Sequence, residues 1–171
     1  MQRMELKKLI RIANLEDIQI ISDIAVIVRK SMLNDGLNQW LGDYPAYQDF
    51  HKDFLKDGLF VLEEDNQILG SLSILSEDDL AYLEVHWESD KALVIHRILV
   101  NPLFQGKGKG KEMINYAIQK GQKEGFTGIK IDTHPNNIKM QKMLKSLDFV
   151  YRGYLSSINR LAYELKIVEE K

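Results

Sequence analysis

In the first third of the chain, apolar positions recur at intervals of three and four residues, the period of a helix with a buried face. The stripe starts after Asn14, and Asp17 follows in the spacing of a capping box, so we expect a helix to begin there. Asn34–Gly36 should end it. The apolar positions are Ile18, Ile21, Ala25, Val28 and Met32, widened by Ile20, Ile24 and Ile27. So wide a stripe predicts a helix that is buried around much of its circumference.

A second helix is predicted from Pro45, because a first helical turn does not need the N–H that proline lacks. Phe50 and Phe54 share one face of this helix, and Gly58 should stop it. Two more helices are expected, one following the loop Asn101–Lys107 and ending near Gly125, the other at Asn137–Leu147.

Alternating or β-branched runs predict strands elsewhere. Asp65-Asn66 tolerates left-handed conformations and favours a tight hairpin, and Glu88–Lys91 should join the next pair of strands. In chain order the expected strands are Leu9–Ala13, Leu59–Glu64, Gln67–Leu75, Leu80–Trp87, Ala92–Val100, Thr127–Asp132, Phe149–Ser156 and Arg160–Val168. The order β-α-α-β-β-β-β-α-β-α-β-β predicts a mixed α/β domain packed in layers.

Composition narrows the function classes. The chain has 171 residues, which suits one domain, and a net charge of −2, which argues against a nucleic-acid binder. It has no cysteine, which fits a reducing, cytoplasmic location. Met1–Lys8 is too polar for a signal peptide, and no apolar run is long enough to cross a membrane. The four histidines lack metal-ligand spacing, so no metal is expected.

The most informative stretch is the glycine-rich loop Gln105–Lys111, which leads from a strand into a helix. Glycine lets backbone N–H groups come close to a ligand, and a helix start adds unpaired N–H groups and a positive dipole end. Three lysines add charge, so the loop suits a phosphate or pyrophosphate, although a solvated turn is the plainer alternative. The sequence fits neither a P-loop, because Glu112 follows Gly110-Lys111, nor the dinucleotide pattern Gly-x-Gly-x-x-Gly.

Gln105, Gly108 and Gly110 instead fit Gln/Arg-x-x-Gly-x-Gly/Ala, which resembles the acetyl-CoA signature of the GNAT superfamily of N-acetyltransferases. Arg97–Val100 with Asn101-Pro102 resembles the family's cofactor strand, and Asn137 to Phe149 its second CoA segment. The resemblance is strongest from His96 to Gly153. It implies one GNAT-like domain over residues 1–171, with a mixed, mostly antiparallel sheet of about seven strands and about four helices.

The resemblance also implies acetyl-CoA as the cofactor. Its pantetheine would add beside the strand ending at Val100, where backbone N–H groups would polarise the thioester carbonyl. An acceptor amine would then attack directly once a base had taken its proton. The implied cofactor-binding residues are Ile98, Leu99, Val100, Gln105, Gly106, Lys107, Gly108, Lys109, Gly110, Lys111 and Asn137.

His96 is the first candidate for the base, since it lies on the cofactor strand and should share a face with Val94, Ile98 and Val100. A histidine that only fills the sheet is the alternative. Glu84 and His86, expected on one face of the preceding strand, are the next candidates, unless they merely lie at a solvated strand end.

Two positions depart from the family pattern. Leu144 stands seven residues after Asn137, where family members often carry a tyrosine as general acid, so no acid is assigned there. A thiol leaving group, with a pKa near ~8.5, can depart without full protonation. Asp148 replaces the glycine that usually precedes Phe149, so this helix is expected to end differently.

The acceptor pocket should come from the first half of the chain. Trp40 and Tyr44 lie between the first two helices, beside Asp43, and could hold a cationic amine, or else simply cover the core. The acceptor is a small-molecule or peptide amine that the sequence does not identify. A homodimer is possible, and the sequence does not determine the oligomeric state. The competing functions are a catalytically silent acyl-CoA-binding regulatory module and an RNA- or nucleotide-binding protein using Lys107–Lys111.

Overall fold

The computed structural model describes residues 7–168, so most of the segment Met1–Lys8 lies outside the described part. The strands are β1 (Lys8–Ile12), β2 (Leu59–Glu64), β3 (Gln67–Leu75), β4 (Ala92–Val100), β5 (Gly128–Thr133), β6 (Val150–Leu155) and β7 (Arg160–Lys166). The helices are α1 (Asp17–Asn34), α2 (Tyr47–Leu55), α3 (Lys109–Glu124) and α4 (Ile138–Ser146), with short 3₁₀ helices η1 (Leu80–Glu84) and η2 (Pro102–Phe104). The predicted fold class, a mixed sheet flanked by helices, is confirmed.

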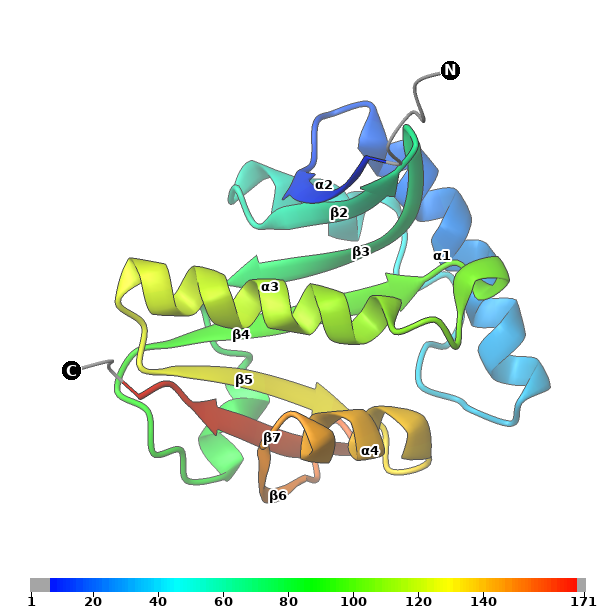
Figure 1. Ribbon diagram of the computed structural model, residues 1–171. Coiled ribbons are helices and arrows are strands. Elements are labelled where there is room, and N and C mark those ends of the chain that lie inside the picture. Colours follow the sequence, from blue (N-terminus) through cyan, green and yellow to red (C-terminus); the bar gives the residue numbers. More distant parts are fainter. Residues whose placement is uncertain (1–6, 169–171) are drawn as a thin grey trace.

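The seven strands form one sheet in the order β1-β2-β3-β4-β5-β7-β6 (Figure 1). Neighbouring strands are antiparallel except for β4 and β5, which run parallel. A parallel pair needs a crossover connection, and α3 supplies it. The sheet's only parallel step in the described part of the chain falls in its middle.

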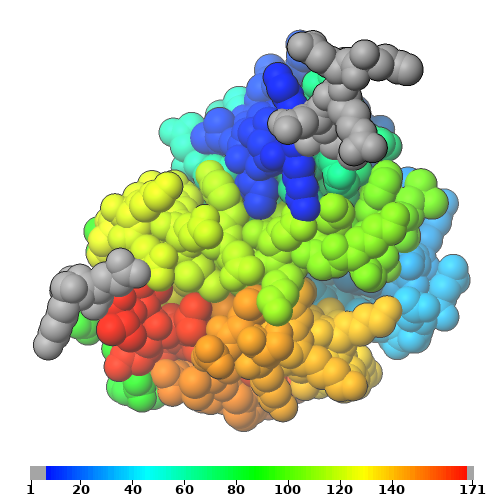
Figure 2. Space-filling model, in the orientation of Figure 1, coloured from blue at the N-terminus to red at the C-terminus, as the bar shows by residue number. Residues whose placement is uncertain are grey.

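Helices cover the sheet on both faces. α3 and α4 lie on the face turned to the viewer in Figure 1, with α1 and α2 behind the sheet. Met113, Ile114 and Leu144 pack on the first face, and Ile18, Ile21 and Phe50 on the second. In the space-filling view α3 crosses the middle of the surface, between the N-terminal strands and the α4–β6 region (Figure 2). The core is thus two apolar layers, one on each side of the sheet.

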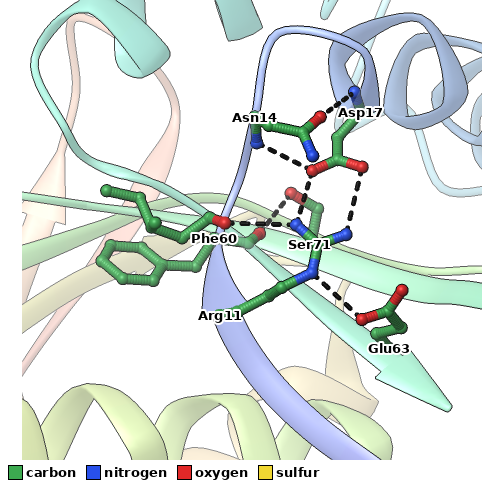
Figure 3. Close-up of polar contacts among 7 residues, drawn as sticks. Arg11, Asn14, Asp17, Phe60, Glu63 and Ser71 are labelled. Atoms are coloured by element: carbon green, nitrogen blue, oxygen red, sulfur yellow. Dashed lines mark hydrogen bonds and ion pairs between the residues drawn. The ribbon is translucent and has the colours of Figure 1, made fainter. Parts of the chain in front are cut away.

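The start of α1 is fixed by the capping box that the sequence predicts. Asn14 Oδ1 accepts from the N–H of Asp17 (3.0 Å), and Asp17 Oδ2 accepts from the N–H of Asn14 (2.8 Å). Figure 3 shows Arg11 of β1 donating to both oxygens of Asp17 and to Glu63 of β2. This cluster ties the helix start to two strands, so α1 is anchored where it leaves the sheet edge.

The predicted hairpin is also confirmed. Asp65 and Asn66 have φ of 53° and 63°, and Glu64 pairs with Gln67 across the turn. Both turn residues occupy the left-handed region that such two-residue turns need, and Asn and Asp tolerate it better than most residues.

The prediction of a strand at Leu80–Trp87 is wrong. Asp79 instead caps η1 by accepting from the N–H of Ala81 (2.9 Å), and the segment packs Tyr82 inward while Leu80 and Leu83 face solvent. The physical reason lies in the sheet: β4 already pairs with β3 on one edge and β5 on the other. A hairpin through Glu88–Lys91 would have to pair with the first half of β4, Ala92–Ile95, which β5 already occupies, so the expected neighbouring strand does not form.

The prediction for the start of α2 needs a smaller correction. Pro45 precedes the N-cap residue Ala46 and so lies outside the first turn. Asp49 closes the helix start by accepting from the N–H of Ala46 (2.8 Å). None of the helices described by the structure is long and apolar enough to cross a membrane.

Candidate active site

The strands β4 and β5 part halfway along β4. Their pairing runs from Ala92 with Gly128 to Ile95 with Ile131. In the described part of the chain, β4 has no further partner on this edge from His96 to Val100. Its backbone groups there are open to a ligand that adds beside the strand.

A bulge changes the direction of β4 at the same place. Ser73 pairs with His96 and Ser71 with Leu99, so Leu72 lies opposite two residues, Arg97 and Ile98. Arg97 has a φ of 48°, in the left-handed region that non-glycine residues rarely adopt. Such a conformation persists only where its surroundings hold it.

The bulge overturns the predicted grouping of His96 with Ile98 and Val100, while its grouping with Val94 holds. The extra residue shifts the alternation, so His96 lies with Val94 and Leu99, while Ile98 and Val100 face the opposite layer with Ile95. Periodic counting along the sequence fails here because it assumes one residue on β4 for each residue on β3.

Arg97 is held by a buried ion pair. Its Nε and Nη2 each lie 2.7 Å from an oxygen of Asp53 on α2, and its Nη1 donates to the hydroxyl of Tyr44 (3.0 Å). Ser73 of β3 also donates to Asp53. The bulge is therefore braced by α2 and by the loop that precedes it.

The glycine loop takes the form that its sequence predicts. Gly106 and Gly108 have φ of 78° and 74°, and Gly108 is the N-cap of α3. The N–H of Glu112 bonds back to the carbonyl of Gly108 (3.1 Å), whereas the N–H groups of Lys109–Lys111 belong to the first turn, which lacks intrahelical acceptors. Added Cβ atoms at Gly106 and Gly108 would meet open space. This open, donor-rich helix start fits a pyrophosphate.

A cavity of about 380 Å³, the glycine-loop cavity, lies between this loop, β4 and α4. Met32, Phe104, Met140 and Met143 add an apolar wall that the sequence analysis missed. Only Lys107 of the predicted cofactor residues does not line it. Those that do are Ile98, Leu99, Val100, Gln105, Gly106, Gly108, Lys109, Gly110, Lys111 and Asn137.

The three loop lysines are placed differently. Lys109 Nζ lies 3.1 Å from Glu64 of β2, Lys107 lies over the ring of Phe104, and Lys111 is exposed. Glu64 therefore partly neutralises the charge of Lys109 before any ligand binds.

Asn137 caps α4 as predicted, accepting from the N–H of Met140 (3.2 Å). Its Nδ2 also donates to Gln39 Oε1 (2.9 Å), in the loop between α1 and α2. The helix ends with Asp148 at a φ of 67° and with the N–H of Phe149 on the carbonyl of Leu144 (3.0 Å). Asp148 thus takes the left-handed position that glycine would fill, so the predicted departure in the helix end is wrong.

A second cavity of about 370 Å³, the His96 cavity, opens on the other side of the β4–β5 split. Ile98 lines both cavities, so the two meet at the bulge. The residues around the His96 cavity include Trp40, Tyr44, Asp78, Asp79, Ile95, His96, Arg97, Ile98, Ile131, Asp132 and Arg160. The two predicted acceptor residues, Trp40 and Tyr44, are among them; Trp40 is buried and Tyr44 is exposed.

His96 lies in this cavity with its ring stacked on Tyr82, the centroids 6.4 Å apart. Burial and the charge of Arg97 lower its pKa to about 4. The ring is therefore neutral at neutral pH, but it is a weaker base than an ordinary histidine.

The structure adds a carboxylate that the sequence analysis did not select. Asp132, the residue before the last of β5, lines the same cavity, and its Oδ2 accepts from the hydroxyl of buried Tyr82 (2.7 Å). Burial raises the pKa of the Asp132 carboxyl, although the Tyr82 hydrogen bond and Arg160 oppose the rise. In the sequence, Asp132 could have been selected as a candidate because it lies at the end of a predicted strand, before the turn into the helix that begins at Asn137.

Glu84 and His86 are brought to a different part of the surface. Both are exposed, and neither is among the described residues that line the two cavities. Glu84 Oε1 accepts from the hydroxyl of Ser156 (2.9 Å), and its bonds from Ser157 and Ser156 lower its pKa. They do not share a strand face, because their segment is not a strand.

Comparison with protein families settles the class of protein. Residues 28–149 match the family described as the acetyltransferase (GNAT) family. The chain belongs to the GNAT acetyltransferase family. It is an acyltransferase that uses acetyl-CoA, as the resemblance implied.

Solved structures agree with this assignment. A GNAT acetyltransferase from Streptococcus agalactiae is 27% identical, with 95% of this chain and 96% of that chain covered and a TM-score of 0.80. One from Listeria monocytogenes is 22% identical with the same coverage and TM-score. An acetyltransferase from Salmonella typhimurium, solved with its cofactor acetyl-CoA, shares the fold at 16% identity, 95% coverage of both chains and a TM-score of 0.67. Comparison with curated proteins gives no match.

Proposed function

We propose that this protein is an N-acetyltransferase that transfers the acetyl group of acetyl-CoA to a primary amine of a small molecule or peptide by direct attack. The observation that supports this most is the meeting of two cavities at Ile98, beside the open edge of β4. One cavity offers backbone donors and the other offers side chains that can bind an amine. A direct transfer needs the donor and the acceptor to reach one point from two sides.

On the donor side, acetyl-CoA supplies the acetyl group as a thioester. The helix start at Gly108–Lys111 offers N–H groups for its pyrophosphate, and the apolar wall with Met140 and Met143 suits the pantetheine arm. Ile98, Leu99 and Val100 offer the open backbone edge of β4. Their N–H groups would stabilise negative charge that develops on the acetyl oxygen.

On the acceptor side, Trp40 and Tyr44 border the His96 cavity together with acidic residues. Aromatic faces and carboxylates favour a cationic group, which is the resting form of an alkyl amine. A base must then remove a proton, because an ammonium nitrogen has no lone pair for attack.

A catalytically silent acyl-CoA-binding module is the second candidate, and Leu144 favours it. This residue is fully buried in the core, where a tyrosine acid is common in the family. A thiol leaving group makes that acid dispensable, so the enzyme remains the stronger proposal.

The deciding experiment measures release of CoA, by a thiol reagent, from acetyl-CoA and each of four amines. Spermidine, lysine, kanamycin and a short peptide with a free N-terminal alanine represent the main acceptor classes. We expect turnover with at least one amine, and acetylated product by mass spectrometry. Binding of acetyl-CoA without turnover of any acceptor would favour the silent module.

A further inference from the structure

The carboxylate of Asp132 lies where β4 and β5 separate. The last pair between these strands joins Ile95 and Ile131, so Asp132 is the first β5 residue beyond it. It lines the His96 cavity with Ile98, the residue common to both cavities. Its side chain therefore lies on the acceptor side of the point at which the two cavities meet.

The hydrogen bonds of Asp132 leave part of the carboxylate free. Oδ2 accepts from the Tyr82 hydroxyl (2.7 Å), while Oδ1 lies 3.9 Å from Nε of Arg160, beyond hydrogen-bond distance. Arg160 is turned toward backbone carbonyls, those of Ile158, Asn159 and Gln39. Oδ1 thus keeps acceptor capacity for a donor that enters the cavity.

We propose that Asp132 is the general base that takes the proton from the acceptor's ammonium group, with Tyr82 holding the carboxylate in place. The inference rests on the proposed function, because it assigns a role within that reaction. Tyr82, the hydrogen-bond partner of Asp132, is 1% exposed, so the hydroxyl that it presents is fixed within the core.

The other candidates fit the task less well. Burial and Arg97 lower the pKa of His96 to about 4, which makes it a weak proton acceptor. Glu84 and His86 are exposed and lie outside the two cavities as described. Asp132 lines the His96 cavity, unlike Glu84 and His86, and burial raises its pKa, whereas burial lowers that of His96.

Titratable and charged groups face Asp132 from several elements. Tyr82 comes from η1, Asp79 from its N-cap, Arg97 from β4 and Arg160 from β7. Burial and Asp79 raise the pKa of Asp132, and the Tyr82 hydrogen bond, Arg160 and Arg97 lower it, with burial the largest effect. The acid limb of the rate profile should therefore lie above the ordinary carboxyl value.

The proposed step is balanced. The ammonium gives one proton to Oδ1 of Asp132, which becomes a neutral carboxylic acid. The freed lone pair of the amine forms a bond to the acetyl carbon, and the bond from that carbon to sulfur breaks. The second proton on nitrogen passes to the departing thiolate or to water, and Asp132 returns its proton to solvent.

The first test compares wild type with Asp132→Asn, which keeps size but cannot accept the proton. With the fastest of spermidine, lysine, kanamycin and the alanine peptide, kcat/KM should fall by about 10²–10⁴, the usual contribution of general acid–base catalysis. Hydroxylamine, which is largely neutral at neutral pH and needs no base, should lose less than about tenfold. The melting shift given by acetyl-CoA should stay unchanged.

The outcomes separate the two proposals. If Asp132→Asn turned over the amine as fast as wild type, the role of Asp132 would be overturned, and the proposed function would stand. An equal loss with hydroxylamine would also overturn the role of Asp132, because the residue would then be positioning groups and not accepting a proton. No turnover by wild type with any of the four amines would overturn the proposed function, and this inference with it.

A second variant keeps the test decisive if Asp132→Asn does not fold. Tyr82→Phe removes only a hydroxyl, whose hydrogen bond lowers the pKa of Asp132. The acid limb of kcat/KM should therefore move to higher pH. A limb in the same place as in wild type would overturn the assignment.

Discussion

The two cavities that meet at Ile98 are made of different parts of the molecule. The glycine-loop cavity takes its polar groups mainly from one continuous stretch, the end of β4, the loop and the first turn of α3. The His96 cavity gathers side chains from the loop before α2, the segment after β3, β4, β5 and β7. Backbone groups in a fixed turn bind a common cofactor, whereas side chains collected from separate elements can differ from one protein to the next. The comparison explains why the cofactor was easier to infer than the acceptor.

The largest expected effect concerns the backbone of the glycine loop. Gly108→Val should abolish the rise in melting temperature that acetyl-CoA gives, because a branched side chain would stand between the pyrophosphate and the N–H groups. Differential scanning fluorimetry, with and without acetyl-CoA, measures this.

Gly125→Val is the matched control for Gly108→Val. Gly125 has a φ of 78°, similar to 74° at Gly108, and also faces open space, but it lies at the other end of α3. Both variants carry the same backbone strain, and only Gly125→Val should keep the shift. If folded Gly108→Val showed the normal rise in melting temperature with acetyl-CoA, the pyrophosphate would not bind at this loop.

The next effect concerns the ion pair between Asp53 and Arg97 at the bulge of β4. Asp53→Asn should destabilise the protein by roughly 3–5 kcal/mol, because it leaves Arg97 partly buried without its counter-charge. Urea denaturation measures the free energy of unfolding. Glu124→Gln, which breaks the exposed pair with Lys120, should cost less than about 1 kcal/mol. If the two variants lowered the free energy of unfolding by the same amount, the Asp53–Arg97 pair would stabilise the protein no more than an exposed pair does.

A third effect lies in the core under the glycine-loop cavity. Leu144→Ala should cost roughly 2–5 kcal/mol, since its side chain is fully buried. Ile138→Ala on the same helix, where the side chain is about half exposed, should stay within about 0.5 kcal/mol. A stable Leu144→Ala protein that had lost turnover would instead place this residue in the chemistry.

The smallest effect should come from His96. With Asp132 as the base, His96→Gln should reduce kcat/KM by less than about tenfold and leave the acid limb in place. The pH profile of kcat/KM over the acid range measures both. A loss of about 10²–10⁴ together with a vanished limb would return the role of base to His96.

Local patterns in the sequence predicted most of the fold correctly. The hairpin at Asp65-Asn66, the capping box of Asn14 and Asp17, and the end of α3 at Gly125 each depend on residues close together in the chain. The strand prediction for Leu80–Trp87 failed because it depends on whether the first half of β4, Ala92–Ile95, has a free edge. That depends on β5, about forty residues farther along the chain.

The donor side could be predicted from the sequence: a helix start with free N–H groups follows from glycines and their neighbours, and the family resemblance follows from the same stretch. The acceptor side required the folded chain. The bulge at Arg97 put His96 on the opposite face from Ile98 and Val100, and the packing of η1 against β4, β6 and β7 brought Tyr82 to Asp132. Backbone sites are encoded by local conformation, whereas the burial and partners of a side chain are set by elements distant in sequence, so the raised pKa of Asp132 exists only in the folded chain.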